Sequence, residues 1–153
     1  MMYMHHNPPS GSPCACTSLR KATRTLDRLY DAALAPHGIT TTQFALMRNI
    51  ERAGAIVLNQ LATSLVMDRT SLYRTIRAIE EAGWVSIADG PGKARLAQIT
   101  DAGRAMLRRA EPDWEDLQAQ IHDRLGGDGW ARLMEMSGAI IALGQTAGRE
   151  ARA

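Results

Sequence analysis

The segment DRTSLYRTIRAIEEAGWV, residues 68–85, is the feature that most constrains the fold. Successive residues of a helix are about 100° apart around its axis. A helix here therefore has one apolar side, formed by Leu72, Ile76 and Ile79. The opposite side is polar and basic and is formed by Thr70, Arg74 and Arg77. Asp68 is a natural N-cap, and Gly83 is a natural stop. The pattern predicts a capped helix with one face in a core and a separate basic face in solvent.

A second short helix is predicted before this segment and a β-hairpin after it. The stretch LNQLATSLVM, residues 58–67, has one apolar face and reaches Asp68 without glycine or proline, so only a tight turn fits between the two helices. Beyond Gly83, WVSIA and RLAQI have strand composition, and DGPGK between them is typical of a turn. This order of elements is that of a winged helix-turn-helix with a two-stranded wing.

Amphipathic helices are expected on both sides of this core. Residues 17–36 and 40–53 each show helical spacing of apolar side chains, the second after a threonine cap. Thr100 is expected to cap a helix that runs from Asp101 towards Leu125, with a kink or break near residues 110–112 because of a proline. A last helix is expected from about residue 128 to about residue 146. The predicted fold class is therefore mostly α.

The composition predicts one globular domain after a loose arm. Residues 1–16 hold three prolines and no Asp, Glu, Lys or Arg, so we expect a flexible arm there and a single domain over residues 17–153. The content of 45% hydrophobic and 22% charged residues is ordinary for a globular protein. No apolar run is long enough to cross a bilayer, and no secretory signal is recognised, so a cytoplasmic location is predicted.

The basic helix and the hairpin form the predicted DNA-binding surface. Arginine's planar fork suits both phosphate oxygens and the O6/N7 edge of guanine, and an α-helix fits the major groove of B-DNA. The positive excess also lies in residues 17–100, which hold eleven basic and seven acidic groups, against seven and nine in residues 101–153. The predicted contacts are Arg69, Thr70, Ser71, Tyr73, Arg74, Arg77, Lys93 and Arg95. Two alternatives are a solvated charged face without function and a winged domain that binds only protein.

The sequence resembles the MarR family of multiple-antibiotic-resistance regulators. The resemblance lies in LNQLATSLVMDRTSLYRTIRAIEEAGWV, in Asp89 of the hairpin and in ITDAGRAML after it, and it extends over about residues 17–148. It implies a homodimeric, ligand-responsive transcriptional regulator, usually a repressor, that binds a pseudo-palindromic duplex. The winged core would span about 39–100, with dimerisation helices at about 17–36 and 101–148. The family's wing usually carries Asp-x-Arg, whereas Asp89 is followed here by Gly90 and Pro91.

Two further sites are expected. The terminal helices carry more apolar surface than one chain can bury, and the predicted dimer contacts are Trp114, Leu117, Ile121, Leu125, Trp130, Leu133, Met136 and Ile140. The family resemblance implies a cleft for an unidentified small-molecule effector between these helices and the winged core. Side chains that could border it are Leu19, Leu26, His37, Phe44 and Trp84.

Catalysis is not predicted, and the two cysteines offer an alternative sensor. None of the four histidines has a nucleophile and a carboxylate at a spacing typical of a catalytic triad, and no cofactor or metal is predicted. Cys14 and Cys16 stand just before a helix start that carries Arg20 and Lys21, an environment that lowers thiol pKa values. A thiol-based redox or soft-metal sensor is therefore the alternative to a small-molecule effector.

Overall fold

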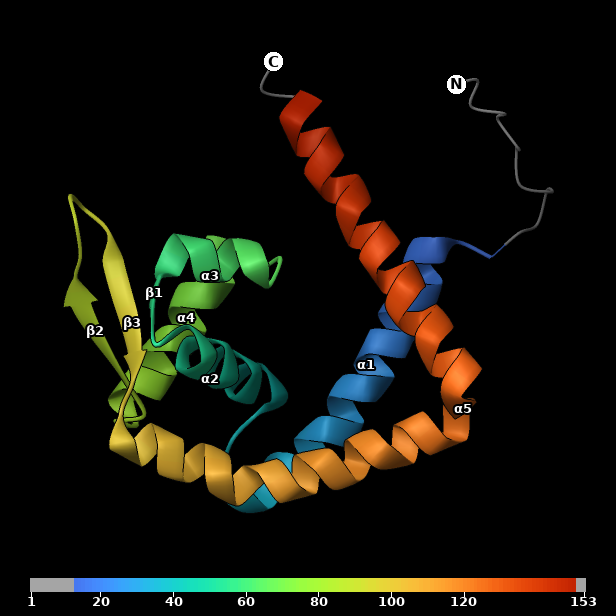
Figure 1. Ribbon diagram of the computed structural model, residues 1–153, viewed down its shortest axis with the longest axis horizontal. Coiled ribbons are helices and arrows are strands. Elements are labelled where there is room, and N and C mark those ends of the chain that lie inside the picture. Colours follow the sequence, from blue (N-terminus) through green and yellow to red (C-terminus); the bar gives the residue numbers. More distant parts are fainter. Residues whose placement is uncertain (1–12, 151–153) are drawn as a thin grey trace.

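The chain forms a winged helix-turn-helix lobe joined to two long helices (Figure 1). The structure is a computed structural model that describes the backbone of residues 13–150 and the side chains of residues 13–144. Its elements are α1 (Ala15–Leu34), the 3₁₀ turn η1 (Ala35–His37), α2 (Thr41–Ala53), β1 (Ala55–Val57), α3 (Leu58–Ser64), α4 (Arg69–Glu81), β2 (Val85–Asp89), β3 (Arg95–Ile99) and α5 (Asp101–Glu150). The predicted mostly α fold with a wing is confirmed.

Helix α1 begins earlier than its sequence predicts. Cys14 is its N-cap, and Ala15 and Cys16 form its first turn, so the helix includes residues that the sequence assigns to the arm. The rest of the predicted arm, residues 1–12, lies outside the described residues. Helix α2 begins as predicted at a threonine: Thr40 accepts from the Gln43 amide, and the Gln43 side chain accepts in return from the Thr40 amide.

The wing contains a third strand that the sequence analysis missed. The strand order is β1-β3-β2, and both pairs are antiparallel. Ile56 of β1 is opposite Ala97 of β3, and Ile87 of β2 is opposite the same alanine on the other edge. Three residues are too few to give an alternating pattern, so β1 is defined by its pairing with β3 rather than by its own sequence.

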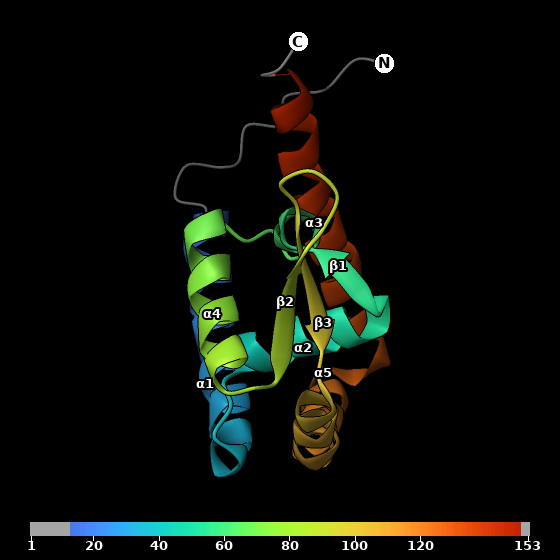
Figure 2. The ribbon, with the colours of Figure 1, turned by 90° about the vertical axis from the view of Figure 1, so that its left-hand side faces the viewer.

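The core lies under α4, where α2, α3, the sheet and the start of α5 meet. Its largest fully buried side chains include Phe44, Leu61 and Leu72. The first turns of α5 contribute Met106, Leu107 and Ala110. Figure 2 shows α4 beside β2, with α5 leading away from the base of the lobe. No helix in the described part of the chain has the length and apolar character needed to cross a membrane.

The interruption in α5 lies at Gly126, where the sequence predicts that one helix ends and the last one begins, whereas the break also expected near residues 110–112 is wrong. Gly126 has φ 68° and ψ 162°, a combination open almost only to glycine, and the helix turns sharply in this region (Figure 1). The backbone stays helical through Pro112. Pro112 is exposed, as is Arg108 one turn earlier, so water can solvate the Arg108 carbonyl that loses its helical donor.

Candidate nucleic-acid interface

Helix α4 begins at a cap formed by the carboxylate of Asp68. Its Oδ1 accepts a hydrogen bond from the amide of Ser71 over 2.9 Å, which confirms the predicted N-cap. This bond lowers the pKa of Asp68, because the amide stabilises the ionised carboxylate. The cap orders the first turn of α4, where Arg69 and Thr70 are exposed.

The two faces predicted for α4 are separate in the structure. Leu72, Ile76 and Ile79 are buried in the core. The opposite side carries the exposed residues Arg69, Thr70, Tyr73, Arg74 and Arg77, and Ser71 is half-buried. In Figure 2 this helix lies at the surface of the lobe with no other element in front of it. The fold therefore presents a continuous polar and basic strip to solvent.

The arginines of this strip differ in their contacts. The guanidinium carbon of Arg69 lies 5.9 Å from the centre of the Tyr73 ring, a cation–π contact. Nε of Arg77 donates to Oε1 of Glu81 over 2.8 Å. Arg74 lies between them and has no ion pair or hydrogen bond with any described side chain. Among the described residues, Arg69 and Arg74 thus both keep their N–H donors free, and Arg74 also lacks any aromatic contact.

The hairpin supplies two further cations beside α4. Its turn is closed by the amide of Gly90, which donates to the carbonyl of Ala94 over 2.8 Å. Lys93 is exposed in this turn, and Arg95 is exposed at the start of β3. Arg95 lies 3.7 Å from Asp89 across the strand pair, so the arginine is partly neutralised. Strand β2 packs against α4, and both cations therefore belong to the same lobe as the basic helix.

The terminal helices leave an apolar surface uncovered. Leu19 and Leu29 of α1 are 40% and 45% exposed, and Met136 and Leu143 of α5 are 62% and 70% exposed. Of the predicted dimer contacts, Leu125 and Ile140 are also exposed, and Leu117, Ile121, Trp130 and Leu133 are half-buried. Trp114 instead packs inside its own chain, against the core.

A small pocket lies where α2 meets α5. The Arg48 guanidinium carbon is 4.5 Å from the centre of the Trp114 ring and 5.6 Å from that of Phe44. Arg48 also pairs with Glu111 over 3.4 Å. The pocket has a volume of about 220 Å³ and is lined by Thr41, Phe44, Ala45, Arg48, Asn49, Arg52 and Trp114. It combines aromatic surface with two guanidinium groups.

The residues expected around an effector cleft are dispersed. Phe44 borders the Arg48 pocket, whereas Leu19 borders a separate groove of about 620 Å³ with Ile140 and Leu143. His37 pairs with Asp113 of α5 over 2.6 Å. Leu26 is half-buried in α1, and Trp84 packs at the base of the wing.

The sequence analysis missed Arg48 and the place of Trp114. Phe44 and Arg48 are one helical turn apart, which signals a shared face of α2. Trp114 reaches that face only through the packing of α5, and its ring lies 6.2 Å from that of Tyr30 in α1. Burial raises the pKa of Tyr30, and its hydroxyl donates to Gln118 of α5. The pocket is thus lined by two helices that are distant in the sequence, α2 and α5, and α1 packs against its tryptophan through Tyr30.

The two cysteines lie on the surface at the start of α1. Both are free thiols and both are exposed. The amide and hydroxyl of Thr17 and the amide of Cys16 lower the pKa of Cys14, although its sulfur lacks the geometry of a capping hydrogen bond. The cause is the helix N-terminus rather than the basic residues Arg20 and Lys21. Among the described residues, no group of three His, Cys, Asp or Glu side chains could hold a metal ion.

Comparisons with known proteins link this arrangement to one family. The sequence model of the MarR family matches residues 39–92. The multiple antibiotic resistance protein MarR of Salmonella typhimurium is 30% identical over 110 residues, which cover 70% of this chain and 76% of that protein. An HTH-type transcriptional regulator of Bacillus subtilis, YhbI, is 23% identical over 120 residues, or 77% and 78% of the two chains.

Solved structures agree with the sequence relatives. The transcriptional regulator MosR of M. tuberculosis, in complex with DNA, is 29% identical with a TM-score of 0.80, covering 88% of this chain and 98% of that one. A mutant MarR of E. coli complexed with operator DNA is 25% identical with a TM-score of 0.74, covering 82% and 91%. These relatives are transcriptional regulators and not enzymes.

Proposed function

Because the chain belongs to the MarR family of transcriptional regulators, we propose that it is a sequence-specific repressor that binds a pseudo-palindromic DNA duplex as a homodimer. The observation that carries the proposal is the exposed strip of α4, which is basic, capped and separate from the buried face of the helix. In this role α4 is the recognition helix, and it lies in the major groove.

Each part of the strip has a chemical role in this proposal. Arg74, with its donors free, forms the bidentate contact to a guanine edge. Arg69, Arg77 and the small hydroxyl residues at the start of α4 bind phosphates and fix the register on the duplex. Lys93 and Arg95 contact the backbone beside the groove, in place of the arginine that the family's wing usually carries.

The homodimer is supported by the apolar surface of the terminal helices. The exposed leucines, isoleucines and methionines of α1 and α5 are too numerous to be scattered surface residues. A second copy of the chain would bury them. When one dimer carries two recognition helices, binding of the second half-site becomes an intramolecular step. This raises the affinity for the duplex without any new contact. Cytoplasmic location remains part of the proposal, since operator DNA is found there.

The effector is best accommodated by the Arg48 pocket. The rings of Trp114 and Phe44 offer stacking surface, and Arg48 and Arg52 offer donors for a carboxylate, so a single-ring aromatic acid fits the chemistry. Arg48 bridges α2 of the winged lobe to Glu111 of α5. A ligand that binds Arg48 would alter its ion pair with Glu111 and favour one arrangement of α2 and α5.

Thiol sensing at Cys14 and Cys16 is the second candidate for release of DNA. It is favoured by the exposure of both thiols and by the lowered pKa of Cys14, because the thiolate is the reactive form. The groove beside Cys16 also reaches Ile140 and Leu143 of α5. Oxidation there would act on the same helices that form the proposed dimer.

Selection of bound fragments from genomic DNA by the purified protein tests the proposed function. We expect enrichment of a two-fold related sequence, with affinity that falls steeply as salt rises. A winged domain that binds only protein would enrich no sequence. For the effector, we expect benzoate, but not the neutral benzamide, to weaken binding to the selected duplex, and Arg48→Gln to abolish the difference. An equal response of the wild type to both compounds would contradict the Arg48 site.

A further inference from the structure

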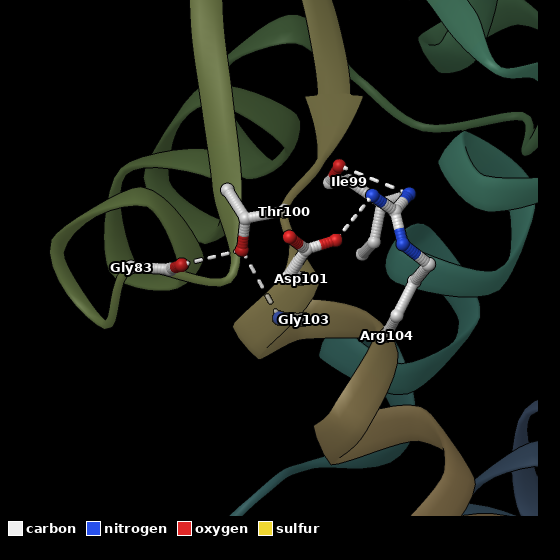
Figure 3. Close-up of polar contacts among 6 residues, drawn as sticks. All are labelled: Gly83, Ile99, Thr100, Asp101, Gly103 and Arg104. Atoms are coloured by element: carbon white, nitrogen blue, oxygen red, sulfur yellow. Dashed lines mark hydrogen bonds and ion pairs between the residues drawn. The ribbon is translucent and has the colours of Figure 1, made fainter.

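Four segments of the chain meet at Thr100, and Figure 3 shows the bonds of its side chain. Its Oγ1 donates to the carbonyl of Gly83 over 2.6 Å and accepts from the amide of Gly103 over 3.0 Å. Its own amide donates to the carbonyl of Trp84 over 3.0 Å. One residue therefore ties the end of the recognition helix and the start of β2 to the end of β3 and the start of α5.

Gly103 packs so closely at this junction that there is no space for a side chain. A Cβ on Gly103 would lie 2.1 Å from the carbonyl oxygen of Trp84 and 2.7 Å from Cδ1 of Ile99, whereas side-chain carbons essentially never approach closer than 3.0 Å. The helix α5 thus packs against the backbone that follows α4 at a distance only glycine allows. Most other described glycines of α5, including Gly127, would face open space with a Cβ.

A second set of bonds holds the first turn of α5 in place. Arg104 donates to Asp101 over 2.8 Å and reaches back to the carbonyl of Ile99 over 3.4 Å. Figure 3 shows these contacts on the other side of the helix start from those of Thr100. The junction is therefore bonded on two sides and tightly packed at Gly103, which leaves little room for α5 to swing against α4.

We propose that Thr100 and Gly103 are positioning residues for DNA recognition: they fix the direction of α4 relative to α5, and so the separation of the two recognition helices in the dimer. The inference rests on the proposed function, because it needs a duplex that two half-sites engage together. Neither residue touches the DNA. They act through Gly83 and Trp84, which directly follow the recognition helix.

The dimensions make such a role physically reasonable. A Cβ at position 103 needs a displacement of nearly 1 Å to clear the Trp84 carbonyl, from 2.1 Å to at least 3.0 Å. The recognition helix is about 20 Å long at 1.5 Å per residue. A small rotation about its C-terminal end therefore displaces most the N-terminal turn, which meets the bases. Half-sites are separated by whole helical turns of DNA, and one base-pair step is about 3.4 Å. A shift of this kind in both subunits disturbs the match to a fixed spacing.

Four variants of the full chain test the proposal. Gly103→Ala introduces the clash, and Gly127→Ala is the matched control, since it makes the same change in the same helix where there is space. Thr100→Val removes the hydroxyl, and Thr100→Ser retains it. Each protein is assayed on the duplex that the wild type selects, on versions with one base pair added or removed between the half-sites, and on a non-specific duplex at equal salt.

We expect Gly103→Ala to lose about tenfold or more in affinity for the selected duplex and to prefer a different spacing, because simultaneous engagement is impaired. Its affinity for the non-specific duplex stays unchanged, since the basic strip is intact. Thr100→Val shows the same pattern more weakly, and Thr100→Ser and Gly127→Ala behave like the wild type. A loss of stability alone would lower the folded fraction and weaken all duplexes equally.

The inference is overturned if folded Gly103→Ala binds every duplex and spacing as the wild type does. If that variant does not fold, the threonine pair decides: equal spacing profiles for Thr100→Val and Thr100→Ser overturn the proposal. Failure of the wild type to select any duplex is a different result, which removes the proposed function itself and this inference with it.

Discussion

Nε of Arg77 donates to Oε1 of Glu81 over 2.8 Å, one helical turn apart on the exposed side of α4. The bond occupies one of the five N–H donors of the guanidinium and leaves those of the terminal nitrogens available. Both side chains are exposed, so the pair adds little to the stability of the fold. Its consequence is electrostatic, because it places a carboxylate beside a cation that we assign to DNA phosphate.

Removing this carboxylate is predicted to strengthen binding to any duplex. Glu81→Gln frees the charge of Arg77, whereas Glu80→Gln removes an equal charge from a side chain that has no recorded ion pair. We expect affinity for a non-specific duplex, and its dependence on salt, to rise more in Glu81→Gln than in Glu80→Gln. Fluorescence anisotropy over a salt series measures both. Identical gains in the two variants would mean that Arg77 does not face phosphate.

The Asp68 cap predicts a stability difference that depends on pH. The Ser71 amide lowers the pKa of Asp68 below its ordinary value of 3.8, so the folded state favours the ionised carboxylate. The stabilisation is fully present above that value and is lost as the pH falls through the lowered pKa. Asp68→Ala should therefore lower the Tm at pH 7 and differ progressively less from the wild type below pH 3.8.

The matched control for the cap is Thr40→Ala, which removes a neutral cap from α2. It should cost about 1 kcal/mol, and the loss should not follow the titration of a carboxylate. Thermal unfolding monitored by circular dichroism between pH 7 and pH 3 separates the two cases. A difference between the wild type and Asp68→Ala that stays constant down to pH 3 would contradict the assignment.

The proposed dimer predicts that a charge on the apolar surface of α5 will separate the subunits. Met136 is 62% exposed in one chain, and Met136→Asp places a carboxylate where a partner would lie. Val66, 69% exposed in the turn before α4, is the control: Val66→Asn also makes an exposed apolar residue polar, and Asn tolerates the left-handed φ of 52° there.

Light scattering is the readout for the dimer. We expect dimers for the wild type and Val66→Asn, and monomers or aggregates for Met136→Asp and for a chain truncated before Gly129. The variants that lose the dimer should also bind the selected duplex weakly. A monodisperse dimer formed by the truncated chain would show that the surface has another role.

The thiol alternative predicts a response confined to the two cysteines. Hydrogen peroxide should weaken binding of the wild type to the selected duplex, and a Cys14→Ser, Cys16→Ser double variant should be unaffected. The lowered pKa of Cys14 predicts that its alkylation stays fast at a lower pH than that of a free cysteine. An equal response of both proteins to peroxide removes the cysteines from the mechanism and leaves the Arg48 pocket.

The sequence was sufficient for features set by local chemistry. The caps at Thr40 and Asp68 and the two faces of α4 depend on residues within one or two turns, and the structure confirms them. The helix start at Thr100 follows the same rule. Spacing and capping residues determine such elements before any tertiary contact forms.

Features set by distant packing were missed or wrongly located. Strand β1 exists because Ile56 pairs with Ala97, and the Arg48 pocket exists because α5 brings Trp114 onto α2. A break in α5 was also expected near Pro112, since proline removes a helical donor, but the exposed helix tolerates that loss. The interruption at Gly126 lies where the sequence predicts one helix to end and the next to begin, since glycine alone readily adopts this backbone conformation.

The most direct test of DNA recognition by α4 compares two variants, Arg74→Ala and Lys93→Ala. Their binding to the duplex that the wild type selects is measured at fixed salt. Loss of a bidentate base contact should cost Arg74→Ala about 1 to 3 kcal/mol and relax the preference at one base pair in each half-site. Lys93→Ala should weaken binding evenly across sequences and reduce the salt slope by about one. If Arg74→Ala retains both the affinity and the sequence preference of the wild type, α4 does not read the DNA.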